Sequence, residues 1–340
     1  MKNIRNFLSL FLVILFAVYV SNYEESTQAA ADLSVDTVTI SGESFGIKMH
    51  TQGVLVISTA EVQTEKGICT PAEQAGFRAG DIITAINGKR IDNCAQVSQL
   101  IEKSGGKEII IGIKRGEKEK SVALTPALCS SSGTYKAGLW IRDSTAGIGT
   151  VTFFDKQGNF AALGHGVTDV DTGTLLPLKN GEAVSSDIIG FSQAQNGKAG
   201  ELYGVLGSDT IGKITKNTDG GIYGKARSAA ISGKSFPVAQ PKEIKRGKAS
   251  IITTIDDKGP QEFEAEIVFV SRLGTSYKDI IVKITDEALL ERTGGIVQGM
   301  SGSPILQNGM FVGALTHVFL NKPDTGYAVF GYKMLNLAKQ

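Results

Sequence analysis

The stretch GGIVQGMSGSPILQNG, from Gly294 to Gly309, packs glycines and two serines into a few residues and then continues as an apolar run. The run that follows Pro304 has the character of a buried strand, so the loop leads directly into a sheet. Gly299 and Gly302 free the backbone around Ser301, which lets successive N–H groups point at one spot. The stretch therefore predicts a loop that presents a serine nucleophile, with the amides of Gly299 and Ser301 as oxyanion donors.

Ser303 is the competing nucleophile in the same loop. No small flexible loop precedes Ser303, and Pro304 follows it directly, so Ser301 is preferred. A glycine loop can also cradle a phosphate, but this one lacks the lysine and the following helix that such a cradle needs.

A serine nucleophile of this kind needs a neighbouring base. The chain has three histidines, which are His50, His165 in AALGHGV and His317 in GALTHVF. His165 ends an apolar strand between two glycines, which let a substrate approach the imidazole closely. We expect His165 to take the proton from Ser301; a strand-end histidine in an ordinary turn is the alternative.

The segment HGVTDVD adds Asp169 and Asp171 shortly after His165, and such residues also occur in metal sites. No second histidine lies nearby, and the cysteines do not have the spacing of a zinc site. We therefore expect no metal and no other cofactor.

Composition places the chain among ordinary globular proteins. It has 340 residues, of which 41% are apolar and 20% charged, so two domains are the natural expectation. A net charge of +1 gives no field strong enough to indicate nucleic acid. The 41 glycines and 8 prolines indicate many tight turns. Three irregularly spaced cysteines are not a disulfide framework, and free thiols are expected, although a Cys69–Cys94 pair remains open.

Residues 1–40 begin with Lys2 and Arg5 and then run apolar from Phe7 to Val20. A positive start before a short hydrophobic core is typical of a signal sequence, so we expect the rest of the chain outside the cytoplasm. The small-residue site at Ala29–Ala31 lies well beyond the apolar run. Two outcomes therefore stay open, a signal anchor kept in the membrane and a signal peptide that is removed.

Residues 41–126 form one coherent unit. The segment GVLVIST alternates like a strand, TPAEQAG predicts a short helix, and DNCAQVSQLIEKSGG predicts a helix capped by Asp92 or Asn93. The part AEQAGFRAGDIITAINGKRI resembles the PDZ domains of bacterial proteases. Such domains bind an extended peptide as an added strand and hold its terminal carboxylate with backbone N–H groups.

The PDZ resemblance implies where a C-terminal or internal peptide lies. SFGIKM resembles the carboxylate loop, which places Phe45, Gly46 and Ile47 at the end of the peptide, and Val97 and Ile101 line the opposing helix. The alternative is that these residues belong only to the core of a small β domain, and it remains open.

Residues 127–340 form a second unit with many short strands punctuated by Gly, Asn and Asp. Helices are expected only in DEALLERTGG and GYKMLNLAKQ. Many short strands at regular spacing indicate an all-β sandwich or barrel. The expected fold class of the chain is therefore mainly β, with a PDZ-like domain followed by a double β-barrel with an active site between its barrels.

The loop GMSGSP, followed by a strand, a turn and GALTHV, resembles the nucleophile segment of chymotrypsin-fold serine proteases, and AALGHGV stands in the place of their histidine segment. The signal segment, one PDZ domain, GHG and GGIVQGMSGSPILQNG together resemble the stage IV sporulation protein B peptidases of endospore-forming bacteria. The likeness covers the chain from about Asp36 onward. It implies a chymotrypsin-like protease domain and the activity of a serine endopeptidase.

The same resemblance implies a biological role in sporulation. The enzyme is expected to be exported from the forespore into the space between the two membranes around it and to cleave a membrane-bound regulatory protein there. That cleavage releases an intramembrane protease, which processes a sigma-factor precursor. Self-cleavage near the N-terminus is also implied, and Ser21–Ser41 is the accessible polar segment for it.

The catalytic acid of the family lies shortly before the serine, which points to Asp286 in VKITDEALL. Asp286 ends an apolar strand, where a carboxylate can be fixed against an imidazole. It also begins DEALLERTGG and can act as the N-cap of that helix. Both roles remain open, and Asp279 and Asp209 are the reserves for the acid.

By analogy, the strand after the nucleophile turn forms the wall of the specificity pocket, so Thr316 and His317 are expected there. A plain core or rim histidine is the alternative for His317. Met300 stands where digestive enzymes of this fold have an aspartate, so activation by a newly cut N-terminus is not expected. Regulation is expected instead from the anchor, the PDZ domain or partners.

A second class of function is an exported PDZ adaptor whose barrel has lost activity and serves as a scaffold. The intact GHG and GMSGSP motifs argue against it.

Overall fold

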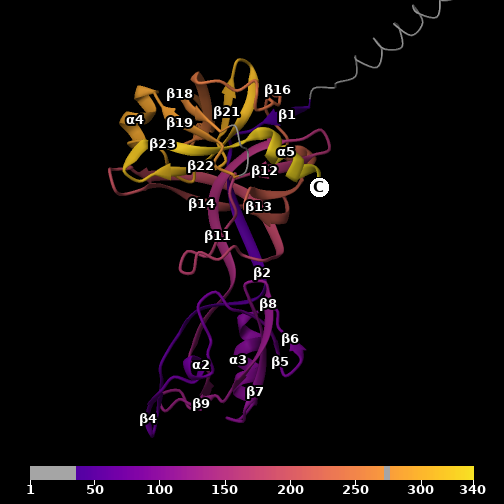
Figure 1. The fold of residues 1–340 in the computed structure, drawn as a ribbon, viewed down its shortest axis with the longest axis vertical. Helices are drawn as coiled ribbons and strands as arrows, with labels where there is room; N and C mark the ends of the chain where they lie inside the picture. The colour runs from indigo at the N-terminus through magenta and orange to yellow at the C-terminus, as the bar shows by residue number, and fades with distance from the viewer. Residues whose placement is uncertain (1–35, 272–275) are drawn as a thin grey trace, which may run out of the picture. The chain divides into compact units, whose positions relative to one another are not determined.

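The computed structural model describes residues 36–271 and 276–340, and the expected signal segment lies outside them. Most of the described residues are in β-strands, as predicted (Figure 1). Within this part of the chain no helix is long and apolar enough to cross a membrane. The three cysteines are free thiols.

Six strands pair into a closed ring that forms the first barrel. The pairings run from β11 through β12, β15, β14, β13 and β2, and β2 pairs again with β11. The core of this barrel includes Phe45, Met49, Phe160 and Leu163. Its strands are β2 (Ser44–Thr59), β11 (Leu139–Phe154), β12 (Asn159–Ala162), β13 (Leu178–Ser192), β14 (Gly200–Thr218) and β15 (Gly221–Ala226).

Short elements extend the first barrel. Strand β1 pairs with β11 and with β16, and β20 pairs in parallel with β14. These elements, with one 3₁₀ turn, are β1 (Thr37–Ile40), β16 (Ser235–Pro237), β20 (Val297–Gln298) and η1 (Ser228–Ala230).

The second barrel is closed by another six strands, in the order β17-β18-β19-β23-β22-β21. Its core includes Ile251, Ile267, Val282 and Leu315. Two barrels agree with the predicted double β-barrel, and the two helices lie where the sequence predicts them. The elements are β17 (Gly247–Thr254), β18 (Pro260–Val270), β19 (Ile280–Ile284), α4 (Glu287–Thr293), β21 (Pro304–Gln307), β22 (Met310–Phe319), β23 (Lys322–Phe330) and α5 (Gly331–Lys339).

A smaller unit lies in sequence between the first half of β2 and the second half of β11. Its sheet joins the end of β2 to β5, β7 and β8, and its core includes Val54, Ile83 and Ile111. Asn93 caps α3 by accepting the amide of Gln96, which confirms one of the two predicted caps. Its other elements are β3 (Val62–Thr64), β4 (Gly67–Cys69), α2 (Pro71–Gln74), β5 (Ile82–Ile86), β6 (Lys89–Arg90), α3 (Cys94–Lys103), β7 (Ile109–Arg115), β8 (Lys118–Leu124), β9 (Ala127–Leu128) and β10 (Tyr135–Lys136).

The strands β2 and β11 each serve both units. The start of β2, through Thr51, pairs with β13 of the first barrel, whereas Val54 and Leu55 pair with β5. Likewise Leu139–Arg142 of β11 pair with the end of β2, and Ser144–Thr150 pair with its start. The unit boundaries therefore fall within these two strands, and not at the ends of 41–126 as the sequence suggested.

The pairing of β2 contradicts the predicted role of Phe45, Gly46 and Ile47 in peptide binding. Phe45 is completely buried in the first barrel, and Ile47 lies in the same core. Gly46 pairs with Val184, and a Cβ atom on Gly46 would lie 2.7 Å from the Val184 side chain. These three residues therefore belong to the core of the first barrel. The apolar pattern of SFGIKM is the same in a buried strand and in a carboxylate loop, so the pattern alone did not separate the two.

Candidate active site

Ser301 precedes β21 of the second barrel, His165 follows β12 of the first, and the two segments approach each other through glycines. A Cβ atom on Gly302 would lie 2.5 Å from the backbone nitrogen two residues before His165. On the other side, a Cβ atom on Gly164 would lie 2.9 Å from the Thr316 methyl group. These close contacts leave no room for a side chain at either glycine. Because both positions are glycine, the two predicted catalytic segments can meet at the junction of the barrels.

The first barrel fixes the carbonyl groups of the nucleophile loop. Thr150 donates from its hydroxyl to the Gly299 carbonyl over 2.8 Å and from its amide to the Ser301 carbonyl over 3.0 Å. The Thr152 hydroxyl donates to the Gly302 carbonyl over 2.7 Å. These bonds set the peptide planes around Ser301, which is the preorganisation that an oxyanion site needs.

Ser303 supports the loop from inside. Its side chain is fully buried, and its hydroxyl donates to the Met300 carbonyl over 2.6 Å. Ser301 is only half-buried, so the geometry favours Ser301 as the nucleophile. The amides of Met300, Gly302 and Ser303 donate to backbone carbonyls, whereas the amide of Ser301 has no such acceptor among the residues that the structure describes. The predicted donor roles of Ser301 and Gly299 both stay predictions.

The Ser301 hydroxyl donates to the carbonyl oxygen of Thr316 over 2.7 Å. The next residue, His317, stacks near His165, with ring centroids 4.8 Å apart and ring planes inclined by 40°. Thr316 thus contacts Ser301, and His317 contacts His165. Their role as the wall of a specificity pocket stays a prediction.

The tautomer of His165 follows from its hydrogen bond. Nδ1 lies 2.9 Å from the carbonyl oxygen of Gly166, and because a carbonyl only accepts, Nδ1 carries the proton and Nε2 is the basic nitrogen. Burial lowers the pKa of His165, although the bond to Gly166 acts the other way. Burial, with the charges of His165 and Lys278, lowers the pKa of His317 to about 4. Both imidazoles are therefore neutral at pH 7.

The triad role predicted for Asp286 is not what the structure shows. Oδ1 of Asp286 accepts the amide of Leu289 over 3.0 Å, and Oδ2 accepts the amide of Glu264 over 3.3 Å. This carboxylate caps helix α4 and has no hydrogen bond to His165. The alternative N-cap role is the one that the structure displays.

Neither reserve aspartate replaces Asp286. Asp279 is completely buried in an ion pair of 2.7 Å with Lys333, and Asp209 is exposed on β14. Among the described residues no carboxylate hydrogen-bonds to His165. The carbonyl of Gly166 is thus the group that orients the His165 imidazole in the described structure.

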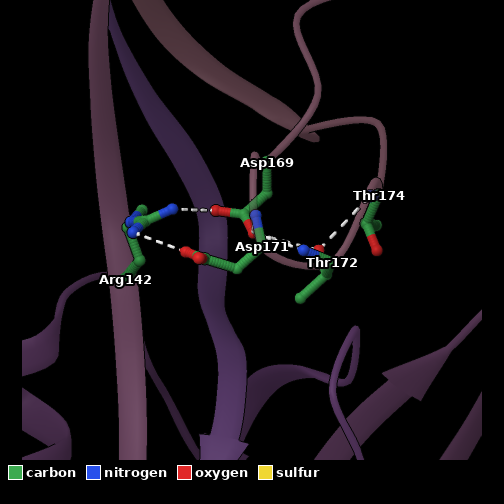
Figure 2. Close-up of polar contacts among 5 residues, drawn as sticks. All are labelled: Arg142, Asp169, Asp171, Thr172 and Thr174. Atoms are coloured by element: carbon green, nitrogen blue, oxygen red, sulfur yellow. Dashed lines mark hydrogen bonds and ion pairs between the residues drawn. The ribbon is translucent and has the colours of Figure 1, made fainter. Parts of the chain in front are cut away.

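The two aspartates after His165 bind an arginine. Figure 2 shows Arg142 of β11 reaching both carboxylates, with Asp169 and Asp171 on one loop. In the part of the chain that the structure describes, no three His, Cys, Asp or Glu side chains are placed to hold a metal ion.

Asn217 is a site residue that sequence reasoning missed. Its Oδ1 accepts the amide of Val167 over 2.8 Å, and its Nδ2 donates over 2.9 Å to each of the carbonyls of Val167 and Leu176. Asn217 thereby ties the loop after His165 to β14. Only the neighbouring turn sequence NTDGG marks this place in the chain, and nothing in it indicates a contact with the histidine loop.

A cavity of about 480 Å³ adjoins the nucleophile loop. Gln298 and Gly299 form one side, and β13 and β14 contribute the apolar side chains Ile189 and Tyr203. Ile189 is 70% exposed and Tyr203 is 47% exposed. An apolar cleft beside the nucleophile loop is suited to hold substrate side chains.

A second cavity, of about 630 Å³, lies in the smaller unit between α3 and the start of β11. Val97 and Ile101 line it and are also core residues of the unit, and their contact with a bound peptide stays a prediction. The facing wall is Lys136–Ile141, where Gly138 has a φ of 68° and Trp140 is 67% exposed. In the sequence, the glycine followed by an apolar strand in KAGLWI is the signal that could have located this wall of the cavity.

Comparisons with protein families match both units. The SpoIVB peptidase S55 family model matches residues 133–335, and the PDZ domain model matches residues 69–115. The putative zinc metalloprotease LL2128 of Lactococcus lactis is 34% identical over 119 residues, 35% of this chain and 26% of that protein. Serine protease HTRA1 of Xenopus laevis is 40% identical over 57 residues, 17% of this chain and 12% of that protein. The chain thus spans about a quarter or less of these relatives.

Solved structures show weaker likeness. The active form of the Rv3671c protease of M. tuberculosis is 12% identical, with 56% of this chain and 72% of that chain covered and a TM-score of 0.35. The HtrA-type protease AlgW is 9% identical, with coverages of 88% and 64% and a TM-score of 0.36. The PDZ domain of the SdrC-like protein from Listeria monocytogenes is 23% identical, with coverages of 26% and 87% and a TM-score of 0.22.

Proposed function

Because the chain belongs to the SpoIVB peptidase S55 family, we propose that it is a serine endopeptidase in which Ser301 attacks the scissile carbonyl and His165 takes its proton. The observation that carries the proposal is the junction of the barrels. There the Ser301 hydroxyl bonds to Thr316, the residue beside His317, and the ring of His317 lies 4.8 Å from that of His165. The bond from Nδ1 to Gly166 leaves Nε2 of His165 as the base.

Catalysis requires the Ser301 hydroxyl to leave the Thr316 carbonyl and turn towards His165. The turn exchanges one neutral hydrogen bond for another, so its net cost is about 1 kcal/mol or less. The imidazolium that then forms is supported by the Gly166 carbonyl and by no carboxylate among the described residues. Loss of the acid from a full triad lowers the rate by about 10⁴-fold. We therefore expect slow turnover, which suffices for an enzyme that cleaves a single partner protein.

The proposed place of action is outside the cytoplasm, in the space between the two membranes around the forespore. Family membership and the signal-like residues 1–40, which lie outside the described structure, support this assignment. The proposed substrate is a membrane-bound regulatory protein whose cleavage lets an intramembrane protease process a sigma-factor precursor. The chain also cleaves itself within Ser21–Ser41, which frees it from its anchor.

The PDZ unit is proposed to bind a C-terminal or internal peptide of the protein substrate. The groove between α3 and Lys136–Ile141 supports this, because it is apolar, open and has the exposed Trp140 at its edge. Peptides add to such grooves as an extra strand.

Labelling of Ser301 tests the proposed activity without knowledge of the substrate. Purified full chain is treated with a fluorescent fluorophosphonate, beside the Ser301→Ala and His165→Ala proteins. The wild type is expected to become labelled and both variants are expected to stay unlabelled while folded. Membranes that contain the wild-type chain are expected to accumulate a shortened form, and those with Ser301→Ala only the full form. An unlabelled wild type, or self-cleavage by Ser301→Ala, would refute the proposal.

An inactive PDZ adaptor is the second candidate. The Ser301 hydroxyl donates to a backbone carbonyl, and no hydrogen bond joins it to His165 among the described residues, which favours this candidate. The labelling experiment separates the two, because an adaptor binds peptide in its groove but does not react with the fluorophosphonate.

A further inference from the structure

The loop that follows His165 is organised around the carboxylate of Asp169. Oδ1 of Asp169 accepts the amides of Asp171 and Thr172 over 3.1 and 3.0 Å and the Thr172 hydroxyl over 3.1 Å. Its own amide donates to the Thr174 carbonyl over 2.9 Å. The side chain of Asp169 is 0% exposed. The carboxylate therefore holds the loop in one shape, only four positions from the catalytic base.

One arginine compensates the buried charge. Arg142 donates from one nitrogen to Oδ2 of Asp169 and from another to Asp171 over 3.0 Å (Figure 2). Burial alone would raise the pKa of Asp169, but the hydrogen bonds from Thr172 and the charge of Arg142 outweigh it, and the pKa is lowered. Without the arginine the loop would contain an uncompensated buried anion, which destabilises strongly.

The histidine loop has a second anchor at its base. There Asn217, a residue of β14, forms hydrogen bonds with the backbone of Val167 and Leu176. Asn217 fixes the stem of the loop, and Arg142 fixes its far side. The position of His165 therefore depends on contacts to two different strands.

The strand that carries Arg142 also carries the contacts of the nucleophile loop. Thr150, further along β11, bonds to the carbonyls of Gly299 and Ser301. Between the two, Asp143 accepts the amide of Cys94 at the start of α3 over 2.8 Å, which fixes the strand next to Arg142. One strand therefore contacts both the loop of the nucleophile and the loop of the base.

Given the proposed peptidase activity, on which this inference rests, we propose that Arg142 is a positioning residue for His165. Through its ion pairs with Asp169 and Asp171 it holds the histidine loop at a fixed place relative to the nucleophile loop on the same strand. Arg142 touches neither His165 nor Ser301 in any hydrogen bond or ion pair of the described chain, so it acts on catalysis only through the loop.

Substitution of Arg142 tests the inference against a matched control. Arg115 makes a comparable pair of 2.6 Å with Asp81, whose side chain is 1% exposed, but it does so within the PDZ unit. The full-length proteins Arg142→Gln, Arg142→Lys and Arg115→Gln are compared with the wild type. The measurements are the rate constant of inactivation by diisopropyl fluorophosphate from pH 5 to 9, and the thermal unfolding midpoint.

We expect Arg142→Gln to lower the plateau rate constant by about tenfold or more, because displacement of a catalytic group by about 1 Å costs up to 10²-fold. Arg142→Lys keeps a charge and recovers part of the rate. Arg115→Gln lowers the unfolding midpoint but leaves the rate constant unchanged at temperatures where the protein is folded. Equal rate constants for folded Arg142→Gln and wild type would overturn the inference, and so would an equal loss in Arg115→Gln.

Asp171→Asn keeps the test decisive if Arg142→Gln does not fold. Asp171 is 49% exposed, so this change removes one ion pair of Arg142 at little cost in stability. We expect a two- to threefold lower rate constant with an unchanged unfolding midpoint, and an unchanged rate constant would count against the inference. Failure of the proposed function looks different, because then the wild type itself does not react with diisopropyl fluorophosphate.

Discussion

The Ser301 hydroxyl and the Thr316 carbonyl oxygen are joined by a hydrogen bond of 2.7 Å. The hydroxyl of the proposed nucleophile thus donates its proton to a backbone acceptor. For the proposed peptidase this is a resting arrangement, because the neutral hydrogen bond has to break before His165 can take the proton. Two hydrogen bonds, from the Ser301 hydroxyl to Thr316 and from Nδ1 of His165 to Gly166, are the basis for the expected effects of mutations at the site.

Ser301→Ala and Ser303→Ala should have opposite effects. Ser301→Ala removes labelling by a fluorophosphonate and leaves the unfolding midpoint nearly unchanged. Ser303→Ala leaves labelling detectable but lowers stability by about 1 kcal/mol, because the bond of 2.6 Å to the Met300 carbonyl is lost in a buried site. Mass spectrometry of the labelled peptide and chemical denaturation measure the two effects. A label on Ser303 would contradict the assignment.

Asp286 should matter for the stability of α4 and little for chemistry. Asp286→Ala should destabilise the protein by about 1 kcal/mol through loss of the cap, whereas Asp286→Asn keeps a capping oxygen and should be close to wild type. Both should be labelled at rates within a few-fold of wild type. If Asp286 orients His165 in the working enzyme, Asp286→Asn should instead lose about 10⁴-fold in rate, as in a triad. Labelling kinetics of the folded variants decide between the roles.

The stability of the fold should depend on pH through His317. Its pKa in the folded protein is about 4, below the usual 6.5, so between these values the unfolded chain binds the additional proton. Stability from this group is therefore complete above pH 6.5 and is lost as the pH falls towards 4. His317→Asn should lose less stability than wild type over this range. Unfolding midpoints of both proteins at several pH values measure the difference, and parallel curves would exclude the effect.

The labelling rate should rise with pH and reach its plateau through the titration of His165. Burial lowers the pKa of His165, so its basic form is complete at lower pH than for an exposed histidine. The midpoint of the rate profile should therefore lie below the usual value of about 6.5. A midpoint above 6.5 in the wild type would contradict the burial of the base.

Variants of Trp140 and Phe45 should distinguish a residue of the peptide groove from a residue of the barrel core. Trp140→Ala removes an exposed wall of the groove and should weaken binding of a peptide about tenfold without a change in the unfolding midpoint. Phe45→Ala empties a fully buried site of the barrel and should cost about 3–5 kcal/mol, with unchanged peptide affinity in the folded fraction. Fluorescence anisotropy with a peptide selected by phage display on the Ser301→Ala protein measures binding. A loss of peptide affinity in Phe45→Ala, with unchanged affinity in Trp140→Ala, would instead place Phe45 in the peptide groove.

The parts of the site that local pattern determines were predictable from the sequence. Glycines around Ser301 and His165 mark places where chains approach closely, and the structure uses Gly302 and Gly164 in that way. The helix over Cys94–Lys103 follows from its spacing and its Asn93 cap. Such features depend on a few neighbouring residues, so a single sequence carries them.

Other features depend on pairings between distant segments, which one sequence does not carry. Asp286 has the same neighbours whether it caps a helix or orients a histidine, and only the position of His165 in space separates the two. The segment around Phe45 is an apolar strand under either assignment, and its partner, not its composition, places it in the barrel. Asn217 gives no local sign of its contacts with the histidine loop.

The shared strands give the PDZ unit the character of an insertion. His50 of β2 and Ser144 of β11 are partners across an antiparallel pair, where Cα atoms lie about 4.5–5.5 Å apart. The chain leaves the barrel just after His50, at Thr51, and returns to it at Ser144. A two-residue turn such as Asn-Gly can close this gap, so removal of everything between converts the two long strands into a simple hairpin. The PDZ unit is thus inserted within a hairpin of the first barrel, and the strands on either side of that hairpin, β13 and β12, find their partners entirely within the barrel.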